Sequence, residues 1–419
     1  MIACMAVVEL GGAVASADIV DPPGAAPGAP ANTPPLPLPA PAATPEPGWI
    51  QLPLRATELR LSGYAKLDAN YDLRAPQGFY MDVPNIPLRG TPESRLRGTT
   101  TLHVRESRLV LQTRTRTGSA EVGSFLEADF LTAEGSETQT NSTHLRMRRY
   151  YGTYGALLAG QTWSAFMDLD AIPDTVDHEG PSGQIFIRQP QLRWTVPLGA
   201  RRELVLGVEN PSSDFEARPV GSSATPRHRW PDGTGRLTIA GGWGHVSVSG
   251  LARELRSDDG AGHAGAALGY GLGVAGSVAL GEDRLLYELN GGRGIGRYVL
   301  DLGGYGARWD AEGQVAPIPA WGGFAAYQHQ WARAVRSTIV YSETRVYGEP
   351  IADPASVSSM VAPANRRTQS LHVNLFWDVA DQVEVGVEYS RGRRETTDGG
   401  SGVAERLQLG IRFYLVPRR

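Results

Sequence analysis

The sequence predicts an all-β fold: a transmembrane antiparallel β-barrel of about 16 strands with an inward-folded constriction loop. Three observations support this prediction. Long segments alternate apolar and polar residues at every second position, and short and long connections alternate between these segments. The last segment, ERLQLGIRFYL, is amphipathic and carries aromatic residues. Tilted strands of about ten residues span a bilayer, and short turns at one end with long loops at the other are typical of outer-membrane barrels.

The N-terminal 54 residues precede the predicted barrel, which covers residues 55–419. Residues 1–17 are short and fairly apolar, and they end in Ala15-Ser16-Ala17. This cleavage pattern predicts a secretory signal peptide. Residues 18–54 are rich in Pro and Ala, a composition that favours extended polyproline II and buries no core. We expect a periplasmic linker here, either a plain spacer or a segment that contacts peptidoglycan.

The first predicted strand lies in ELRLSGYAKLDANYD, which starts at Glu58. Leu59 and Leu61 fall on one face, and Arg60 and Lys66 fall on the other. Side chains on a strand alternate between faces, so the segment separates an apolar from a charged environment over more than ten residues. The same pattern recurs along the chain, for example in ESRLVLQTRTRT, AEVGSFLEADFLT, HLRMRRYYGTYG, YGALLAGQTW, QLRWTV, RELVLGVEN, HVSVSGLARELR, VRSTIVYSETRVY, TQSLHVNLFWDV and QVEVGVEYSRGRR.

Long polar connections separate pairs of these segments at residues 74–98, 164–183, 211–233 and 347–366. The connection at 164–183 is unusual because it combines five acidic residues with several apolar ones and contains no Lys or Arg. This composition is too apolar for a free solvent loop. It predicts a segment that packs on the inner wall of the barrel and narrows the lumen.

A soluble β-sandwich would also alternate apolar and polar residues. Charges recur on one face of strand after strand, and a dry core would not accommodate them. The strands are also longer than the usual five or six residues. Six tryptophans fall near predicted strand ends, as in the aromatic girdles of membrane barrels: Trp163, Trp194, Trp243, Trp321, Trp331 and Trp377.

Composition argues against several other functions. The net charge of −4 gives no electrostatic basis for binding nucleic acid. The single cysteine, Cys4, lies in the predicted signal peptide, and the eight histidines show no metal-ligand spacing. The GLGVAG run at 271–276 matches a dinucleotide motif but no amphipathic helix follows it. We interpret it as a small-residue strand, with close packing against a neighbouring subunit as one explanation. We therefore expect no metal, no cofactor and no catalytic residues, and no enzyme activity.

Charged residues of opposite sign gather around the predicted constriction. The alternation directs one group of arginines and acids to the barrel interior: Arg108, Arg114, Arg116, Arg146, Arg148, Arg193, Glu121, Glu127 and Asp129. The 164–183 loop contributes Trp163 at its start, then Phe166, Asp168, Asp170, Asp174, Asp177 and Glu179. We expect the acids of the loop to face the arginines across a narrow channel, because opposed charges there set ion selectivity. The alternative is that these arginines are solvated lumen residues paired with neighbouring acids.

A long stretch of the chain resembles the DcaP-like porins of proteobacterial outer membranes. The resemblance is carried by EADF, RMRRYYGTYGALLAGQTWSAFMD and PDTVDHEGPSGQIFIRQPQLRW, between Glu127 and Trp194. It spans about Glu58 to Leu415 and is strongest from Ser107 to Trp194. The resemblance implies a homotrimer of sixteen-stranded barrels that takes up small anionic solutes, dicarboxylates in particular. It also implies that Arg108, Arg146, Arg148, Arg188 and Arg193 contact the anion. The Pro-rich N-terminal segment departs from the family, whose members often carry a coiled coil there.

Two functional hypotheses follow. The first is an outer-membrane porin for passive diffusion of small, anionic, dicarboxylate-like solutes, embedded in outer-membrane lipid. The second is a structural outer-membrane barrel whose Pro-rich segment tethers the membrane to the cell wall, with incidental conduction.

Overall fold

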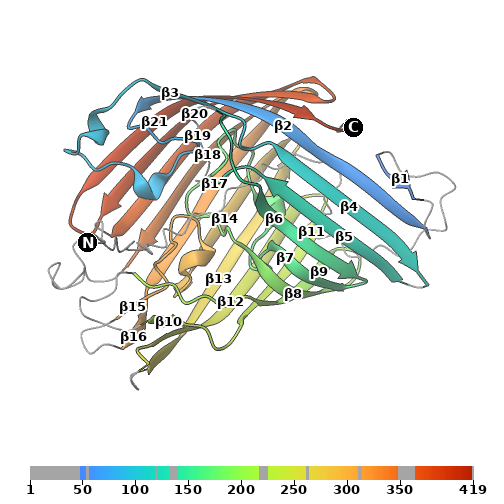
Figure 1. Cartoon of the computed structure of the whole chain (residues 1–419), viewed down its shortest axis with the longest axis horizontal. Helices are drawn as coiled ribbons and strands as arrows, with labels where there is room; N and C mark the ends of the chain where they lie inside the picture. The colour runs from blue at the N-terminus through green and yellow to red at the C-terminus, as the bar shows by residue number, and fades with distance from the viewer. Residues whose placement is uncertain are drawn as a thin grey trace, which may run out of the picture.

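The computed structural model describes residues 48–52, 56–118, 120–132, 140–216, 225–260, 264–309, 314–347 and 364–417. The predicted signal peptide and nearly all of the predicted linker lie outside these ranges. No helix in the described ranges is long and apolar enough to cross a membrane. The chain forms a closed antiparallel β-barrel (Figure 1), as the sequence predicts.

Sixteen strands form the barrel wall within the described residues. They are β2 (Thr57–Arg74), β4 (Arg108–Thr117), β5 (Ala120–Asp129), β6 (Arg146–Tyr154), β7 (Leu157–Trp163), β8 (Arg188–Pro197), β9 (Arg202–Glu209), β11 (Asp232–Gly241), β12 (Gly244–Asp258), β13 (Ala264–Leu280), β14 (Asp283–Arg293), β17 (Pro319–Ala332), β18 (Val335–Val346), β19 (Asn365–Ala380), β20 (Val383–Thr396) and β21 (Ser401–Tyr414). Each pairs with its neighbours in sequence, and β2 closes the ring by pairing with β21. Closure leaves no free sheet edge in the membrane.

Short strands and 3₁₀ turns lie before the first wall strand and in the segments that connect the wall strands. They are the strands β1 (Ile50–Gln51), β3 (Thr99–His103), β10 (Thr225–Arg227), β15 (Ala307–Trp309) and β16 (Val315–Pro317), and the 3₁₀ turns η1 (Val83–Asn85), η2 (Glu93–Arg95), η3 (Leu169–Ala171) and η4 (Gly296–Tyr298). β3 and β4 both pair with β2 and act as one interrupted strand. At the interruption the Lys66 amide donates to Ser107 Oγ at 3.0 Å.

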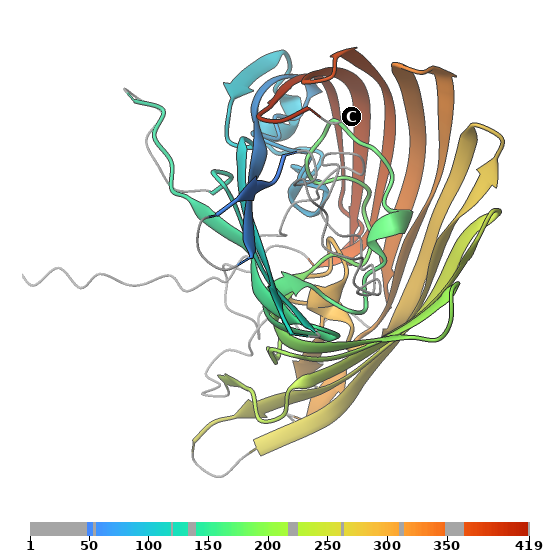
Figure 2. The same cartoon turned by 90° about the vertical axis from the view of Figure 1, so that its right-hand side faces the viewer.

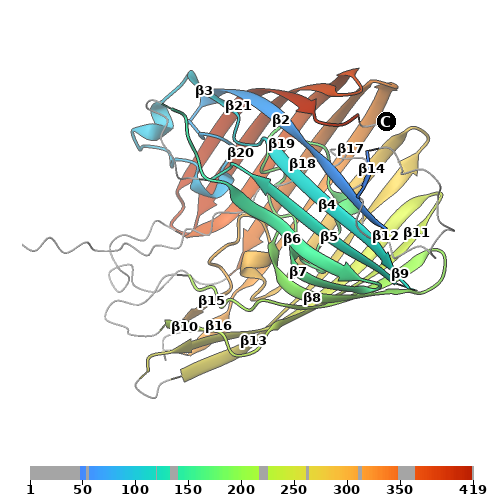
Figure 3. The ribbon, with the colours of Figure 1, turned by 45° about the vertical axis from the view of Figure 1, so that its right-hand side comes forward.

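Tight turns join the strands at one end of the barrel and longer segments join them at the other (Figure 3). Outward positions are apolar, and Leu109 on β4 is 49% exposed. Inward positions carry the polar and charged residues, which are largely buried. Four of the predicted girdle tryptophans, Trp194, Trp243, Trp331 and Trp377, are exposed near the turn end, which fits a membrane-interface belt. Trp163 is not part of this belt because it is buried beside the constriction loop.

Candidate functional site: the constriction of the lumen

The connection between β7 and β8 folds into the barrel, as the sequence predicts (Figure 2). We refer to residues 164–183 as the constriction loop. All of its residues are buried except Leu169 and Asp170. The loop contains η3, and Asp168 caps this turn by accepting a hydrogen bond from the Asp170 amide at 3.1 Å.

The first part of the constriction loop, its base, is held by apolar packing. Trp163, Phe166, Met167 and Ile172 belong to one buried cluster with Ile185, Phe186, Leu251, Ile295, Tyr298, Val299, Leu300, Leu302 and Ala320. Burial of several large side chains is the main stabilising term for such a segment. The apolar residues of this acidic loop therefore fix its base to the wall.

Small residues on β13 make room for this cluster. A Cβ at Gly271 would lie 3.5 Å from Phe166, and one at Gly273 would lie 3.0 Å from Ile185. Both glycines belong to the GLGVAG run and face the lumen. The proposed packing of this run against a neighbouring subunit is therefore wrong for these glycines. The run receives the constriction loop of its own chain.

Hydrogen bonds also hold the base of the constriction loop against the wall. Glu209 at the end of β9 accepts hydrogen bonds from Ser164 Oγ at 2.9 Å and from the Ala165 amide at 2.8 Å. Asp168 lies 3.0 Å from His245 Nε2 and accepts a hydrogen bond from Ser247 Oγ at 2.5 Å. Burial alone would raise the pKa of Asp168, but the His245 contact and the positive charge of Arg236 outweigh it and lower the pKa to about 2.

The second part of the loop, residues 174–179, is its tip and crosses to the far wall. Asp174 accepts a hydrogen bond from Arg336 Nε on β18 at 2.8 Å. Asp177 accepts from the Met81 amide at 3.0 Å and lies 3.6 Å from Arg406 Nη1 on β21. The expectation that the loop acids face the arginines of β4 and β6 is therefore wrong for Asp168, Asp174 and Asp177. Their partners lie on β12, β18 and β21.

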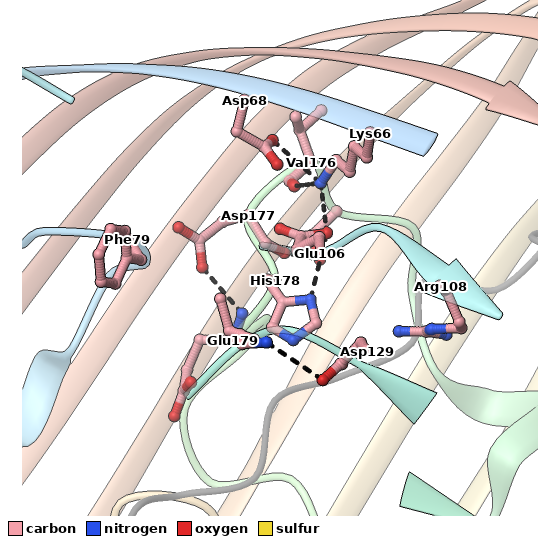
Figure 4. A network of polar contacts seen from close by, with 12 residues as sticks. Lys66, Asp68, Phe79, Glu106, Arg108, Asp129, Val176, Asp177, His178 and Glu179 are labelled. Atoms are coloured by element: carbon pink, nitrogen blue, oxygen red, sulfur yellow. Dashed lines mark hydrogen bonds and ion pairs between the residues drawn. The ribbon is translucent and has the colours of Figure 1, made fainter. Parts of the chain in front are cut away.

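Burial and neighbouring charges shift the titration of the tip. Burial raises the pKa of Asp177 to about 6, although Arg406 and His372 act in the opposite direction. Burial, together with the charge of Asp82, raises the pKa of Glu179 well above its usual range. Burial lowers the pKa of His178 well below its usual range, which favours the neutral ring. Nδ1 of this ring lies 3.2 Å from Glu106 Oε2 (Figure 4).

The predicted interior arginines form a cluster on the adjoining wall. Arg148 donates to Glu127 at 2.6 Å and to Asp129 at 2.8 Å, and Arg146 donates to both oxygens of Asp129 at 2.8 Å. Arg108 Nε lies 3.7 Å from Glu127. These five residues face the interior as predicted. Each arginine pairs with a neighbouring acid, as the alternative interpretation expects, but Arg108 and Arg148 are buried rather than solvated.

The other predicted arginines lie apart from this cluster. Arg114 pairs with Glu58 and stacks on Trp49, with 4.3 Å from its Cζ to the ring centroid. Arg193 donates to Gln191 Oε1 at 3.0 Å and to the Trp163 carbonyl oxygen. Arg188 stacks on Trp163 at 4.6 Å. Arg188 and Arg193 thus lie against the start of the constriction loop.

Sequence comparison assigns the family. A model of the DcaP outer membrane protein family matches residues 51–415. The chain belongs to the DcaP outer membrane protein family. It is an outer-membrane barrel of the porin and channel type, located in the bacterial outer membrane. A search of curated proteins finds no match to this DcaP-family chain.

Solved structures show the same fold. The outer membrane channel DcaP of Acinetobacter baumannii superposes with a TM-score of 0.73 at 23% identity, over 86% of this chain and 98% of that chain. An anion-selective porin from Comamonas acidovorans gives a TM-score of 0.56 at 12% identity, over 86% and 100%. A trimer form of OmpT from Vibrio cholerae gives 0.53 at 11% identity, over 86% and 99%.

Several residues of this DcaP-family constriction were missed in the sequence. Arg149 also faces inward and pairs with Glu127, because a register shift between Glu127 and Ala128 turns two successive arginines of β6 to the lumen. The far wall contributes Lys66, Glu106, Arg336, His372, Glu388, Arg406 and Gln408. The period-2 alternation of β2, β18, β19, β20 and β21 places most of these inward. It does not reveal which wall the loop reaches.

Proposed function

We propose that this outer-membrane barrel is a passive diffusion channel that favours small anionic solutes, with dicarboxylate-like solutes as the preferred class. The observation that supports this most directly is the charge of the arginine cluster. Within the described residues, the guanidinium groups of Arg108, Arg146, Arg148 and Arg149 form ion pairs with the two carboxylates of Glu127 and Asp129. The cluster therefore carries a formal excess of two positive charges beside the constriction, which favours anions in the lumen.

The four arginines differ in accessibility. The side chains of Arg146 and Arg149 are 15% and 12% exposed, whereas that of Arg148 is fully buried. We infer that Arg146 and Arg149 contact the solute and that Arg148 holds the two carboxylates in place. A guanidinium group binds a carboxylate through two parallel hydrogen bonds. Since both arginines already have a carboxylate partner, the solute exchanges rather than binding tightly, as flux requires.

The channel works as a homotrimer in this proposal. The trimer form of the OmpT barrel, which shares the fold, supports that arrangement. Chemical crosslinking of the protein in detergent, followed by mass measurement, tests it, and a monomer at all concentrations would argue against it.

The main experiment is the zero-current potential in a planar bilayer across a salt gradient, with and without millimolar succinate. We expect anion preference and current block by succinate in the parent protein. The double variant Arg146→Gln and Arg149→Gln should lose much of both, while Arg148 still partners Glu127 and Asp129. Arg391→Gln, at a half-exposed position on β20, is the matched control. An unchanged reversal potential in the double variant would contradict the assignment.

A further inference from the structure

The wall formed by β20 and β21, which β2 separates from the arginine cluster, contains a seat for one apolar side chain of the constriction loop. Gly386 on β20 and Gly410 on β21 are direct cross-strand partners. A Cβ added at Gly386 would lie 2.7 Å from Val176 Cγ2, and one added at Gly410 would lie 3.0 Å from Val176 Cγ1. The two methyl groups of Val176 thus occupy the space that side chains at these positions would fill.

The backbone on both sides of the Val176 side chain is hydrogen-bonded to the barrel wall. Glu388 accepts the amide hydrogen of Val176 at 2.8 Å and that of Asp177 at 3.2 Å. The Val176 carbonyl oxygen accepts hydrogen bonds from Lys66 Nζ at 3.2 Å and from Gln408 Nε2 at 3.3 Å (Figure 4). Both polar groups of this buried backbone segment are therefore satisfied by the barrel wall.

The carboxylate of Glu388 suits this role. Its Oε1 also lies 3.0 Å from His372 Nδ1, and its Oε2 accepts from Asn374 Nδ2 at 3.1 Å. Each oxygen therefore serves one loop amide and one wall side chain. A carboxylate accepts at both oxygens, whereas a side-chain amide accepts at its oxygen and donates from its nitrogen. A glutamine here would fit the space but lose one of the two loop amides in either orientation.

The tip and the base of the loop are held by different contacts. The base lies in the apolar cluster with Phe166 and Ile185. The tip contacts the wall through Val176, through backbone hydrogen bonds and through the ion pair between Asp174 and Arg336. Breaking the contacts of the tip leaves the apolar cluster intact, so the tip can leave the wall without unfolding the base.

We propose that Gly386, Gly410, Glu388, Lys66 and Gln408 form a socket that positions the tip of the constriction loop and so sets the conductance of the channel. This inference rests on the proposed function as a diffusion channel, but it does not depend on anion preference. The residues of the socket are positioning residues, because they act on the solute through the placement of the loop.

Single-channel recording in planar bilayers tests the socket with three variants. Glu388→Gln removes one backbone acceptor, Gly410→Val fills the seat, and Val176→Gly removes the occupant and leaves the wall unchanged. We expect each variant to show a larger mean conductance and more current noise than the parent. Gly250→Val is the matched control, because a Cβ at Gly250 would meet only Leu272, at 3.9 Å.

Folding is checked by the mobility shift of unheated protein on a denaturing gel. If the wall variants do not fold, Val176→Gly still decides, since the loop does not form part of the barrel. Parent-like conductance and noise in a folded Val176→Gly variant would overturn the socket. If the parent protein shows no anion preference, the proposed solute class is overturned, whereas the socket is not affected.

Discussion

Asp177 is the acid of the constriction loop whose environment most affects its charge. It is fully buried at the tip, where Arg406 is 3.6 Å away. Its pKa of about 6 contrasts with the value of about 2 for Asp168 at the base. The base carboxyl therefore stays ionised at any ordinary pH, whereas the tip carboxyl changes charge between about pH 5 and pH 7.

This difference predicts a pH effect that Asp177→Asn should remove. A raised pKa means that the docked tip favours the protonated carboxyl, so its contribution to docking is complete below the ordinary carboxyl pKa of about 4 and is lost as the pH rises from about 4 to about 6. An amide resembles the protonated carboxyl. We expect Asp177→Asn to show lower conductance and less noise than the parent at pH 7.5 and to match it near pH 4. The shift from the ordinary value corresponds to about 3 kcal/mol at most.

Burial favours a neutral His178 and a protonated Glu179, and both residues are present in both proteins, so the comparison isolates Asp177. Single-channel recordings at the two pH values provide the measurement. Equal currents of parent and variant at pH 7.5 would show that ionised Asp177 does not weaken docking.

At the scale of elements, β13 and the constriction loop depend on one another. The inward positions of β13 that lie under the loop are small, and this lets Phe166 and Ile185 approach the wall. Inward positions of β6 and β21, in contrast, carry long charged side chains such as Arg148, Arg406 and Arg412. The inward side chains of β13 are therefore small because the constriction loop packs against them. This packing explains the GLGVAG run, which resembles a nucleotide-binding motif in sequence.

Gly273→Val tests this dependence. Its Cβ would lie 2.6 Å from Ser249 Oγ and 3.0 Å from Ile185 Cδ1, so the base of the loop must shift. Overpacking of this kind costs about 1–3 kcal/mol. We expect faster proteolysis within the constriction loop of the folded variant in detergent. Gly250→Val serves again as the control, and equal cleavage rates in the two variants would contradict the dependence.

The strands were predictable because their signal is local. A lumen on one face and lipid on the other impose a period of two on each strand separately, so β2, β4, β5 and β21 could be recognised one at a time. The inward fold of residues 164–183 was predictable from composition, since Phe166 and Met167 require cover that a solvent loop lacks.

The partners of the loop were not predictable in the same way. Arg336 is 162 residues from Asp174, and Glu388 is 212 residues from Val176. These contacts follow from the path of the loop across the lumen, which no local pattern specifies. The register shift that brings Arg149 inward is likewise a property of the pairing between β5 and β6.

At the scale of the whole molecule, the barrel closes without the Pro-rich segment. β2 pairs with β4 on one side and with β21 on the other, and the family match begins at residue 51. Among the described residues that precede the barrel, β1 pairs with the start of β2. The part of the wall that carries the constriction therefore has its own complete hydrogen-bond network.

Deleting residues 18–47 separates the channel hypothesis from the tether hypothesis. We expect single-channel conductance and reversal potential to remain at the parent values, because the deletion retains β1 and Trp49. A detergent-sensitivity assay of cells that carry the deletion then measures any role in envelope integrity. Reduced conductance would show instead that the segment contributes to the permeation path.

The position of Lys66 has a consequence for chemical labelling. The chain contains a single lysine, and its ammonium group is enclosed by Glu106, Asp68 and the Val176 carbonyl oxygen. Amine-reactive reagents thus meet one side-chain target in the protein, and the tip of the constriction loop covers it. The rate at which that lysine is acylated therefore rises when the tip leaves the wall, from a low value that its ion pairs with Asp68 and Glu106 also set.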